Sequence, residues 1–535
     1  MNGYIERDVI IVGGGIAGLT AALTLAHKGK KVLLLEKNEH AGGLMNSFVR
    51  DGFRFEGGAR ALVNAGLVKS LIKEFALDVE ILPNPVTLGI EDKLLPIQGE
   101  ESLQAYAALL KELYPDSVDA VDRIIDAIHA IIEDMKVLYG VDSPLFAEKK
   151  RNLFVMLPAV AAWMFKFFRT IYRISKMDTP FEDYLAAMSA NQSLNDIIGQ
   201  HFFKKTPVFF ALSYFALYND YVYPKGGVGA LINRMTEKII ALGGELRFGT
   251  EIVQVDPVRH ILVDASGAEY GYKKLIWAAD LKTLYQISGE PAQRAYKKPS
   301  FSEQKEKILH QKGAESVFTL FLAIDVPPEA FKAIASGHMF YTPDRKGLGD
   351  LHGLELKSML AHWDELQKDQ FYDWFHRFCR YNTFEISLPV IRDPDAAPQG
   401  KTGIIISLLF DYELTKKIFD AGWYEEFKAR FESEIINTLA ESLYRDLPIR
   451  EKILFRFSAS PLSIYSQVKS SEGSIVGWSF EGEIPVTASM FRMGDSVNTA
   501  FPDIYAAGKW VYSPAGGPTA IMTGRIAASK CLKRR

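Results

Sequence analysis

Three glycines and one acidic residue near the start of the chain have the types and spacing of a nucleotide-binding site. Gly13, Gly15 and Gly18 follow the GxGxxG pattern. The first permits a tight turn, the second lets the backbone approach a pyrophosphate, and the third lets a helix pack closely on a strand. Glu36 lies about 20 residues beyond the first glycine, where an acid accepts hydrogen bonds from a ribose. The set predicts a dinucleotide site.

The elements that must position these residues are also present in the sequence. Residues 8–12 form an apolar run typical of a buried parallel strand, and residues 31–35 form a second one. Between them, apolar residues recur at helical spacing. The N-terminus of that helix would offer unpaired N–H groups and the positive end of its dipole to phosphates. The alternative is a glycine turn in an α/β unit without a ligand.

A second pair of glycines, Gly42 and Gly43, follows soon after the ribose acid. A second close approach of the backbone to the cofactor favours FAD over NAD. Residues 52–60, with the sequence GFRFEGGAR, contain a further glycine pair. The cofactor-binding residues predicted in this part of the chain are Gly13, Gly14, Gly15, Ala17, Gly18, Glu36, Lys37, Gly42, Gly43, Gly58, Ala59 and Arg60.

Six further segments resemble the flavin amine oxidase superfamily, and within it the branch of phytoene desaturases, carotenoid isomerases and retinol saturases. In chain order they are residues 223–231, 245–255, 275–280, 393–401, 460–478 and 504–519. The resemblance runs nearly end to end and implies a flavoenzyme that binds FAD. It adds six residues to the predicted cofactor site: Val253, Ala279, Gly508, Lys509, Pro518 and Thr519.

The predicted fold is α/β, with more than one lobe, because 535 residues exceed a single ordinary core. A discontinuous Rossmann-type FAD-binding domain is expected to comprise residues 1–75, 220–295 and 480–535. Residues 76–219 are expected to form a helical lobe, with helices over 103–113 and 118–138, and residues 296–479 a substrate domain with a mixed sheet. Its strands are predicted at 317–324, 384–391, 403–410 and 453–457.

Charge and cysteine content argue against some partners and sites. A formal net charge of −3 gives no electrostatic reason to expect nucleic acid. The two cysteines, Cys379 and Cys531, lie far apart without a neighbouring His or Cys, which argues against a disulfide scaffold and a clustered metal site. The first strand begins at Asp8, which leaves no room for a signal peptide, so we expect a cytoplasmic protein.

Residues 149–176 have the pattern of a membrane-contacting helix. A basic triplet precedes a mostly apolar, uncharged run over 152–165, which is shorter than the roughly 20 residues needed to span a bilayer and contains Pro158. Four cations then recur on one helical stripe: Lys166, Arg169, Arg173 and Lys176. Such a helix suits the surface of an anionic membrane, and peripheral membrane association is therefore expected. The alternative is an amphipathic core helix with a solvated basic face.

Two cations are the candidates for catalysis. Flavin carries out hydride transfer itself, so the protein need supply few catalytic side chains. Arg60 follows a glycine pair where the chain should pass the flavin, although it would equally suit a phosphate or a local carboxylate. Lys509 replaces the acid that many proteins of the superfamily place after this Ala-Gly pair. It would pair with a pyrophosphate oxygen or stabilise negative charge on the flavin, unless it points to solvent.

The resemblance implies a FAD-dependent desaturase or saturase that acts on C–C or C=C bonds of a long apolar polyene or isoprenoid lipid. Three alternatives stay open: a redox-neutral cis–trans isomerase that uses reduced FAD, a flavin amine oxidase, and a lipid-binding escort without redox chemistry. No second GxGxxG with its strand, helix and acid occurs in the sequence, so a dedicated NAD(P)H site is not expected. The electron acceptor or donor is left open.

Overall fold

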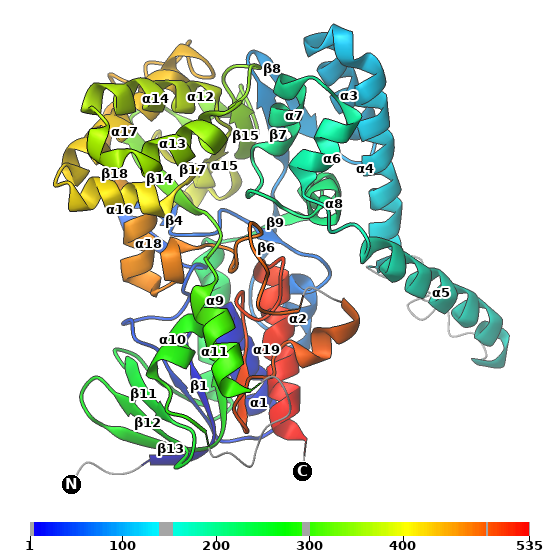
Figure 1. Cartoon of the computed structure of the whole chain (residues 1–535), viewed down its shortest axis with the longest axis vertical. Helices are drawn as coiled ribbons and strands as arrows, with labels where there is room; N and C mark the ends of the chain where they lie inside the picture. The colour runs from blue at the N-terminus through cyan, green and yellow to red at the C-terminus, as the bar shows by residue number, and fades with distance from the viewer. Residues whose placement is uncertain (1–4, 139–152, 292–299, 488–489, 534–535) are drawn as a thin grey trace.

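The structure is a computed structural model that describes residues 5–138, 153–291, 300–487 and 490–533. Each half of the molecule is built around a seven-stranded sheet. Figure 1 shows the first half at the bottom, with both chain ends, and the second half above it, flanked by a group of helices. The predicted α/β fold, with a Rossmann-type domain and a second domain with its own sheet, is confirmed.

The first sheet has the strand order β10-β2-β1-β13-β12-β11, and β19 pairs with β13. All pairs among β10, β2, β1, β13 and β19 are parallel, whereas β11 and β12 are antiparallel. The strands come from three separate parts of the chain: β1 (Ile5–Val12), β2 (Val32–Leu35), β10 (Glu245–Arg247), β11 (Ile252–Asp256), β12 (Ile261–Asp264), β13 (Glu269–Trp277) and β19 (Ile504–Ala506).

Helices cover both faces of this sheet. The helices α1 (Ile16–His27), α9 (Val228–Ala241) and α19 (Gly517–Leu532) bury their apolar residues on one face. The helices α10 (Leu281–Ile287) and α11 (Phe301–His310) cover the other. Since parallel strands buried on both faces need apolar residues throughout, the uninterrupted apolar sequence of β2 is explained.

The second sheet is mostly antiparallel, in the order β18-β14-β17-β16-β15-β7-β8. Only the pair of β7 and β15 is parallel. The strands are β7 (Val86–Ile90), β8 (Lys93–Ile97), β14 (Ser316–Ile324), β15 (His338–Thr342), β16 (Phe384–Ser387), β17 (Thr402–Phe410) and β18 (Ile453–Ala459). One face packs on α14 (Lys368–Tyr381) and α17 (Tyr424–Glu441) through alternate apolar residues, and the opposite face is turned toward the first half.

The second sheet corrects two expectations. The strand predicted over 384–391 ends at Ser387, because Pro389 starts the short helix α15 (Pro389–Arg392), and proline suits the first turn of a helix. Residues 76–219 are not wholly helical, since β7 and β8 pair with the second sheet.

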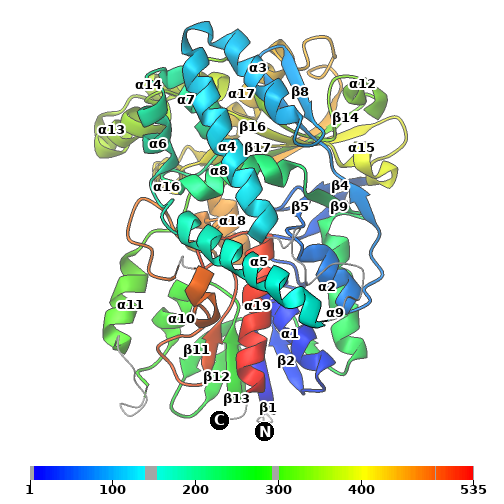
Figure 2. The ribbon, with the colours of Figure 1, turned by 90° about the vertical axis from the view of Figure 1, so that its right-hand side faces the viewer.

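The remaining part of 76–219 is helical and forms one core. Its helices are α3 (Ser102–Leu113), α4 (Val118–Leu138), α5 (Leu153–Ile174), α6 (Phe181–Met188), α7 (Gln192–Gly199) and α8 (Val208–Tyr218). The helix α5 continues through Pro158 and extends away from this lobe (Figure 1), and Figure 2 shows it crossing the molecule at the level where the two halves meet. Among the described residues, no helix has the length and apolar character needed to cross a membrane.

The hairpin of β3 (Ser47–Arg50) and β4 (Phe53–Glu56) packs its phenylalanines against β14 and β17 of the second sheet. A small sheet has the order β5-β9-β6, with β5 (Leu62–Val63), β6 (Ile81–Pro83) and β9 (Tyr221–Pro224). The other α-helices are α2 (Val68–Glu74), α12 (Pro328–Lys332), α13 (Leu356–Ala361), α16 (Tyr412–Asp420) and α18 (Pro461–Val468).

Candidate active site

One large cavity lies between the two halves of the molecule. Its volume is about 1320 Å³, and its lining runs from the N-termini of α1 and α19 to the inner face of the second sheet and the helices α5 and α8. Typical ligand pockets have roughly 300–1,000 Å³. A cavity of this size has room for a dinucleotide and a second ligand.

The glycine-rich turn shapes one end of the cavity. Gly13 has φ = +104°, and a Cβ there would lie 2.8 Å from the carbonyl carbon of Ala278. A Cβ on Gly18 would lie 1.9 Å from the Gly13 carbonyl oxygen, so helix and turn pack without space for a side chain. By contrast, a Cβ on Gly15 would meet nothing within 4 Å, and Gly15 lines the cavity. The turn thus leaves open the volume that a pyrophosphate would occupy.

Two helix N-termini meet this end of the cavity. The helix α1 begins at Ile16 with no side-chain cap and no acidic residue in its first turn. Its first N–H groups therefore lack partners within the helix. The first residues of α19, including Pro518 and Thr519, line the same cavity, and α19 packs against α1. Both positive helix ends favour an anionic ligand.

Glu36 is buried at the end of β2 and lines the cavity. Its Oε2 accepts a hydrogen bond from the Gly14 N–H at 2.6 Å, and its Oε1 accepts one from the Asn38 N–H at 3.0 Å. These two bonds fix the carboxylate, and each oxygen keeps a further lone pair for a ribose hydroxyl. Glycine turn, helix ends and fixed acid together fit FAD.

Most of the predicted cofactor-binding residues line the cavity. They are Gly13, Gly15, Ala17, Glu36, Lys37, Gly42, Gly43, Gly58, Ala59, Arg60, Ala279, Gly508, Lys509, Pro518 and Thr519. Gly14 and Gly18 do not line the cavity themselves. The Gly14 N–H donates a hydrogen bond to Glu36, and Gly18 packs against the turn. Val253 does not line the cavity: its side chain is 45% exposed, and the neighbouring Glu251 and Ile252 line the cavity instead.

Lys509 lies inside the molecule and does not point to the outer surface. Its Nζ donates a hydrogen bond to Ser470 Oγ at 2.8 Å and another to the Ser474 carbonyl oxygen. Burial lowers the pKa of Lys509 to about 7, although the charge of Asp280 opposes this shift. An amine that titrates near neutral pH thus lines the cavity beside Gly508 and Trp510.

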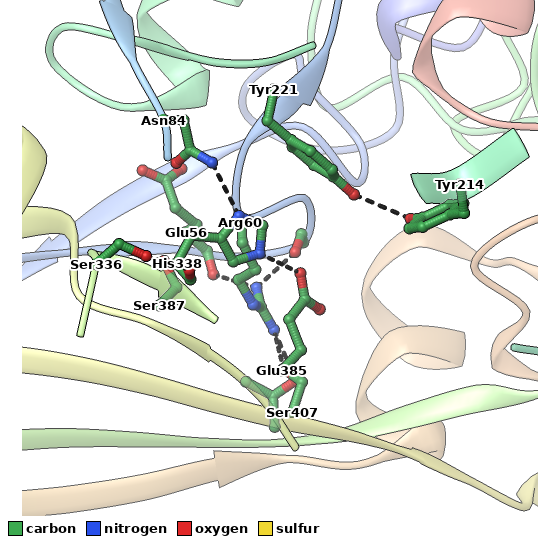
Figure 3. Close-up of polar contacts among 12 residues, drawn as sticks. Glu56, Arg60, Asn84, Tyr214, Tyr221, Ser336, His338, Glu385, Ser387 and Ser407 are labelled. Carbon is green, nitrogen blue, oxygen red and sulfur yellow. Dashed lines mark hydrogen bonds and ion pairs between the residues drawn. The ribbon is translucent and has the colours of Figure 1, made fainter. Parts of the chain in front are cut away.

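Arg60 is buried at the junction of the two halves (Figure 3). One guanidinium nitrogen donates to the carbonyl oxygens of Glu56 and Gly58, and the other donates to Thr319 Oγ1 at 2.9 Å and to Ser407 Oγ. Burial lowers the pKa of Arg60, against the charges of Glu385 and Glu56. Arg60 therefore anchors the glycine-rich segment to β14 and β17.

A polar network beside Arg60 was not predicted from the sequence. His338 on β15 and Glu385 on β16 are joined to Asn84, which precedes β7, and Asn84 in turn contacts Arg392. The tyrosines Tyr214 and Tyr221 lie nearby, with their hydroxyl groups 2.9 Å apart. Figure 3 shows Glu385 between His338 and the tyrosines. The available signal was a glutamate inside an apolar strand, in the sequence FEIS. Among the described residues, no group of His, Cys, Asp and Glu has the arrangement of a metal site.

Comparison with known proteins supports the assignment of this site. Residues 16–372 match the family model described as flavin containing amine oxidoreductase. The chain is 22% identical to the phytoene desaturase (neurosporene-forming) of Rhodobacter capsulatus, over 97% of this chain and 93% of that protein. It is also 22% identical to the all-trans-retinol 13,14-reductase of Danio rerio, over 94% and 82% of the two chains.

The solved structures give the same fold. Wild-type putrescine oxidase bound to putrescine superposes with a TM-score of 0.60, at 15% identity, covering 99% of this chain and all of that one. At this identity the likeness concerns the architecture alone. The family match covers most of the chain, beginning at the first residue of α1 directly after the glycine turn, and it agrees with FAD as the cofactor.

Proposed function

This chain belongs to the flavin containing amine oxidoreductase family, and on that premise we propose that it acts on the C–C or C=C bonds of a long apolar polyene or isoprenoid lipid. It would be a FAD-dependent desaturase or saturase. The relatives named phytoene desaturase and all-trans-retinol 13,14-reductase work on this class of molecule in opposite directions.

The observation that carries the proposal is the continuity of the cavity from the FAD end into an apolar region. Beyond Arg60 the lining is mostly aromatic and aliphatic, and it comes from α4, α5, α8, the loop before α8 and β15: Met135, Ile171, Ile174, Phe202, Phe209, Phe210, Leu217 and Phe340. Such a lining suits a ligand without many polar groups, because buried polar groups of a ligand need partners. A hydride acceptor beside an apolar cavity fits C–H chemistry on a lipid.

A second candidate, amine oxidation, has one observation in its favour. Glu385 places a carboxylate at the cavity, and a carboxylate would pair with an ammonium group. The surrounding apolar lining offers few other partners for a polar amine. The redox-neutral isomerase also remains an alternative, since an isomerase would need the same apolar cavity and the same cofactor.

One anaerobic experiment separates these functions. The holoprotein, oxidised or reduced with dithionite, is mixed with phytoene or all-trans-retinol in liposomes, and the flavin absorbance is followed. Bleaching of oxidised flavin by phytoene supports a desaturase, and reoxidation of reduced flavin by retinol supports a saturase. A changed isomer pattern of an added cis-polyene without a flavin change supports an isomerase. Bleaching by a long-chain amine alone would contradict the polyene proposal.

The helix α5 supports a place for the protein at a membrane surface. Four of its large apolar side chains are exposed, at 71% for Phe165, 62% for Tyr172, 48% for Phe168 and 39% for Met164. They adjoin the exposed stripe that contains Lys166 and Arg169, whereas Ile171 and Ile174 on the opposite side line the cavity. One helix thus separates the substrate cavity from an aromatic and basic surface, which suits uptake of a lipid from an anionic bilayer. A cytoplasmic protein bound peripherally to the membrane would fit this arrangement.

The predicted membrane segment is described only in part. Lys149, Lys150 and Arg151 lie outside the described residues. The four predicted cations differ in their surroundings, because Arg173 forms an ion pair with the buried carboxylate of Asp134. Arg173 is thus held by the protein itself, and Lys166, Arg169 and Lys176 are the exposed cations chosen for the test of lipid contact.

A further inference from the structure

Glu385 brings a carboxylate to the substrate side of the cavity. It lies in the middle of β16, where its register partners are Ser407 on β17 and Phe340 on β15. Its side chain keeps 32% of its accessible surface and lines the cavity, although the strand itself lies deep inside the molecule. The hydroxyl groups of Thr319 and Ser407 on the same face are already engaged by Arg60. The carboxylate is thus in contact with the space that a substrate would fill.

Hydrogen bonds fix the orientation of this carboxylate (Figure 3). Arg392 donates to the amide oxygen of Asn84, so the Asn84 amide nitrogen faces His338 and donates to its Nδ1 at 3.0 Å. The remaining ring nitrogen of His338, Nε2, therefore carries the proton and donates to Glu385 Oε1 at 3.0 Å. Within the described part of the chain, the second oxygen, Oε2, has no hydrogen-bond partner.

The charges around Glu385 keep it ionised. Burial favours its neutral form, but the hydrogen bond from His338 and the charges of Arg60 and Arg392 hold the pKa of Glu385 below its usual range. Burial lowers the pKa of His338, which keeps the imidazole neutral.

The other titratable groups near the carboxylate do not compete with it as bases. Burial raises the pKa of Tyr214 to about 12 and that of Tyr221 well above its usual value, so both phenols stay neutral. Burial also raises the pKa of Glu56, which accepts hydrogen bonds from Tyr223 and Ser47. At neutral pH, Glu385 is therefore the ionised base at this part of the cavity wall.

We propose that Glu385 Oε2 accepts the proton that leaves the substrate when a C–C bond is desaturated. This inference rests on the proposed function and names the direction of the reaction. Two C–H bonds break. Bound FAD would supply the acceptor for one hydrogen and its electron pair, and the hydrogen on the neighbouring carbon leaves as a proton to Glu385. The electron pair of the second C–H bond becomes the new C=C bond. The carboxylate also stabilises the cationic character that develops on the polyene carbon.

The first test compares three forms of the holoenzyme: wild type, Glu385→Gln and Glu434→Gln. Glu434 is a matched control, because it also accepts a hydrogen bond from a histidine, His376 Nδ1 at 2.6 Å, but lies on the outside of the second half. Phytoene in liposomes should bleach oxidised wild-type flavin, and Glu385→Gln should slow the bleaching about 100-fold or more, the usual contribution of general acid–base catalysis. Glu434→Gln should match the wild type.

The pH profile gives a second readout of the same role. The wild-type bleaching rate should fall as the pH is lowered toward the depressed pKa of Glu385, because protonation removes the base. Glu385→Gln should lose this acidic limb. A variant that bleaches at the wild-type rate, or that keeps the acidic limb, would overturn the proposal.

A binding experiment tests the site without turnover. N,N-Dimethyldodecylamine is a cation at neutral pH with a long apolar chain, and it mimics the charge that develops on a polyene carbon. Its binding to oxidised holoprotein, followed by the perturbation of the flavin spectrum and by calorimetry, should weaken at least about 10-fold in Glu385→Gln and not in Glu434→Gln, since an ion pair in the apolar cavity would be lost. Equal affinity of all three proteins would overturn the placement of Glu385.

The two experiments separate the inference from the proposed function. If phytoene fails to bleach the wild type, the function fails for that polyene, and the amine comparison still decides whether Glu385 faces the ligand. If the amine itself bleaches the flavin in a Glu385-dependent way, the carboxylate is an anchor for amine substrates and its role as proton acceptor is wrong.

Discussion

At the scale of single residues, the nucleotide-binding end of the cavity has a sequence motif with fixed spacing, whereas the substrate end has none. The glycines and Glu36 have spacing rules because a cofactor of fixed shape dictates them. Glu385, His338 and Asn84 lie on three strands or segments that pair only in the folded protein. No short motif holds them together, so sequence spacing alone does not reveal their contact.

Lys509 should make the flavin potential depend on pH near neutrality. Below its pKa of about 7 the amine is charged and favours the more negative, reduced flavin; above it the charge is lost. The midpoint potential of wild type should therefore exceed that of Lys509→Met by about 30 mV or more at pH 6, equivalent to about 1.4 kcal/mol for a two-electron couple. The difference should shrink at pH 8, and spectroelectrochemical titration measures both values.

The partly buried Lys305→Met serves as the control for that titration, because it removes a cation that does not line the cavity. Equal potentials for wild type and Lys509→Met at pH 6 would mean that Lys509 only holds the segment of Ser470 and Ser474 in place.

At the scale of elements, two glycines of the turn between β1 and α1 have different roles: Gly15 leaves space for the cofactor, and Gly18 permits the helix to pack on the turn. Gly15→Val should fold but lose FAD, because a Cβ at this position would enter the open volume and meet no protein atom within 4 Å. Gly18→Val should unfold the first half or lower its stability by more than about 3 kcal/mol, since overpacking of a tight contact costs 1–3 kcal/mol and here the contact is with backbone. Circular dichroism and bound flavin absorbance distinguish the two variants; a flavin-loaded Gly15→Val would contradict the site.

The helix α5 should attach the protein to anionic vesicles. Changing Lys166, Arg169 and Lys176 together to Gln should release most of the protein in co-sedimentation, since each cation near such a surface contributes about 1 kcal/mol. Arg173 stays unchanged because its removal would leave the buried Asp134 without its ion pair. A triple change of the exposed Lys332, Lys357 and Arg445 is the control. Equal pelleting of both triple variants would refute the interfacial role.

The elements differ in how far the sequence predicts them. The helices α3 and α4 and the strands β14, β17 and β18 match their predicted positions within a few residues, because their apolar periodicity is local. The sequence did not predict β7, β8 or β15. Their pairing joins residues 86–97 to residues 338–342, and such long-range contacts leave little trace in a short window of sequence.

At the scale of the whole molecule, the cavity lies between two halves that each have their own sheet. FAD bound there would contact residues from the glycine turn, the Arg60 segment and the start of α19 at once. Added FAD should therefore stabilise the apoprotein by about 2.7 kcal/mol when free FAD is 100 times its Kd. Chemical denaturation at several FAD concentrations measures this, and an unfolding midpoint independent of FAD would argue for a lipid-binding role without the cofactor.

The first sheet has a consequence for how the protein is made. The strand β1 (residues 5–12) is translated first. The strand β19 (residues 504–506) and the helix α19 (residues 517–532), which complete the sheet and the cavity wall, are translated near the end of the chain. A nascent chain on the ribosome thus exposes an unfinished sheet edge for most of its translation. Because the first residues of α19 line the cavity, we expect FAD to bind only after this last helix has emerged from the ribosome.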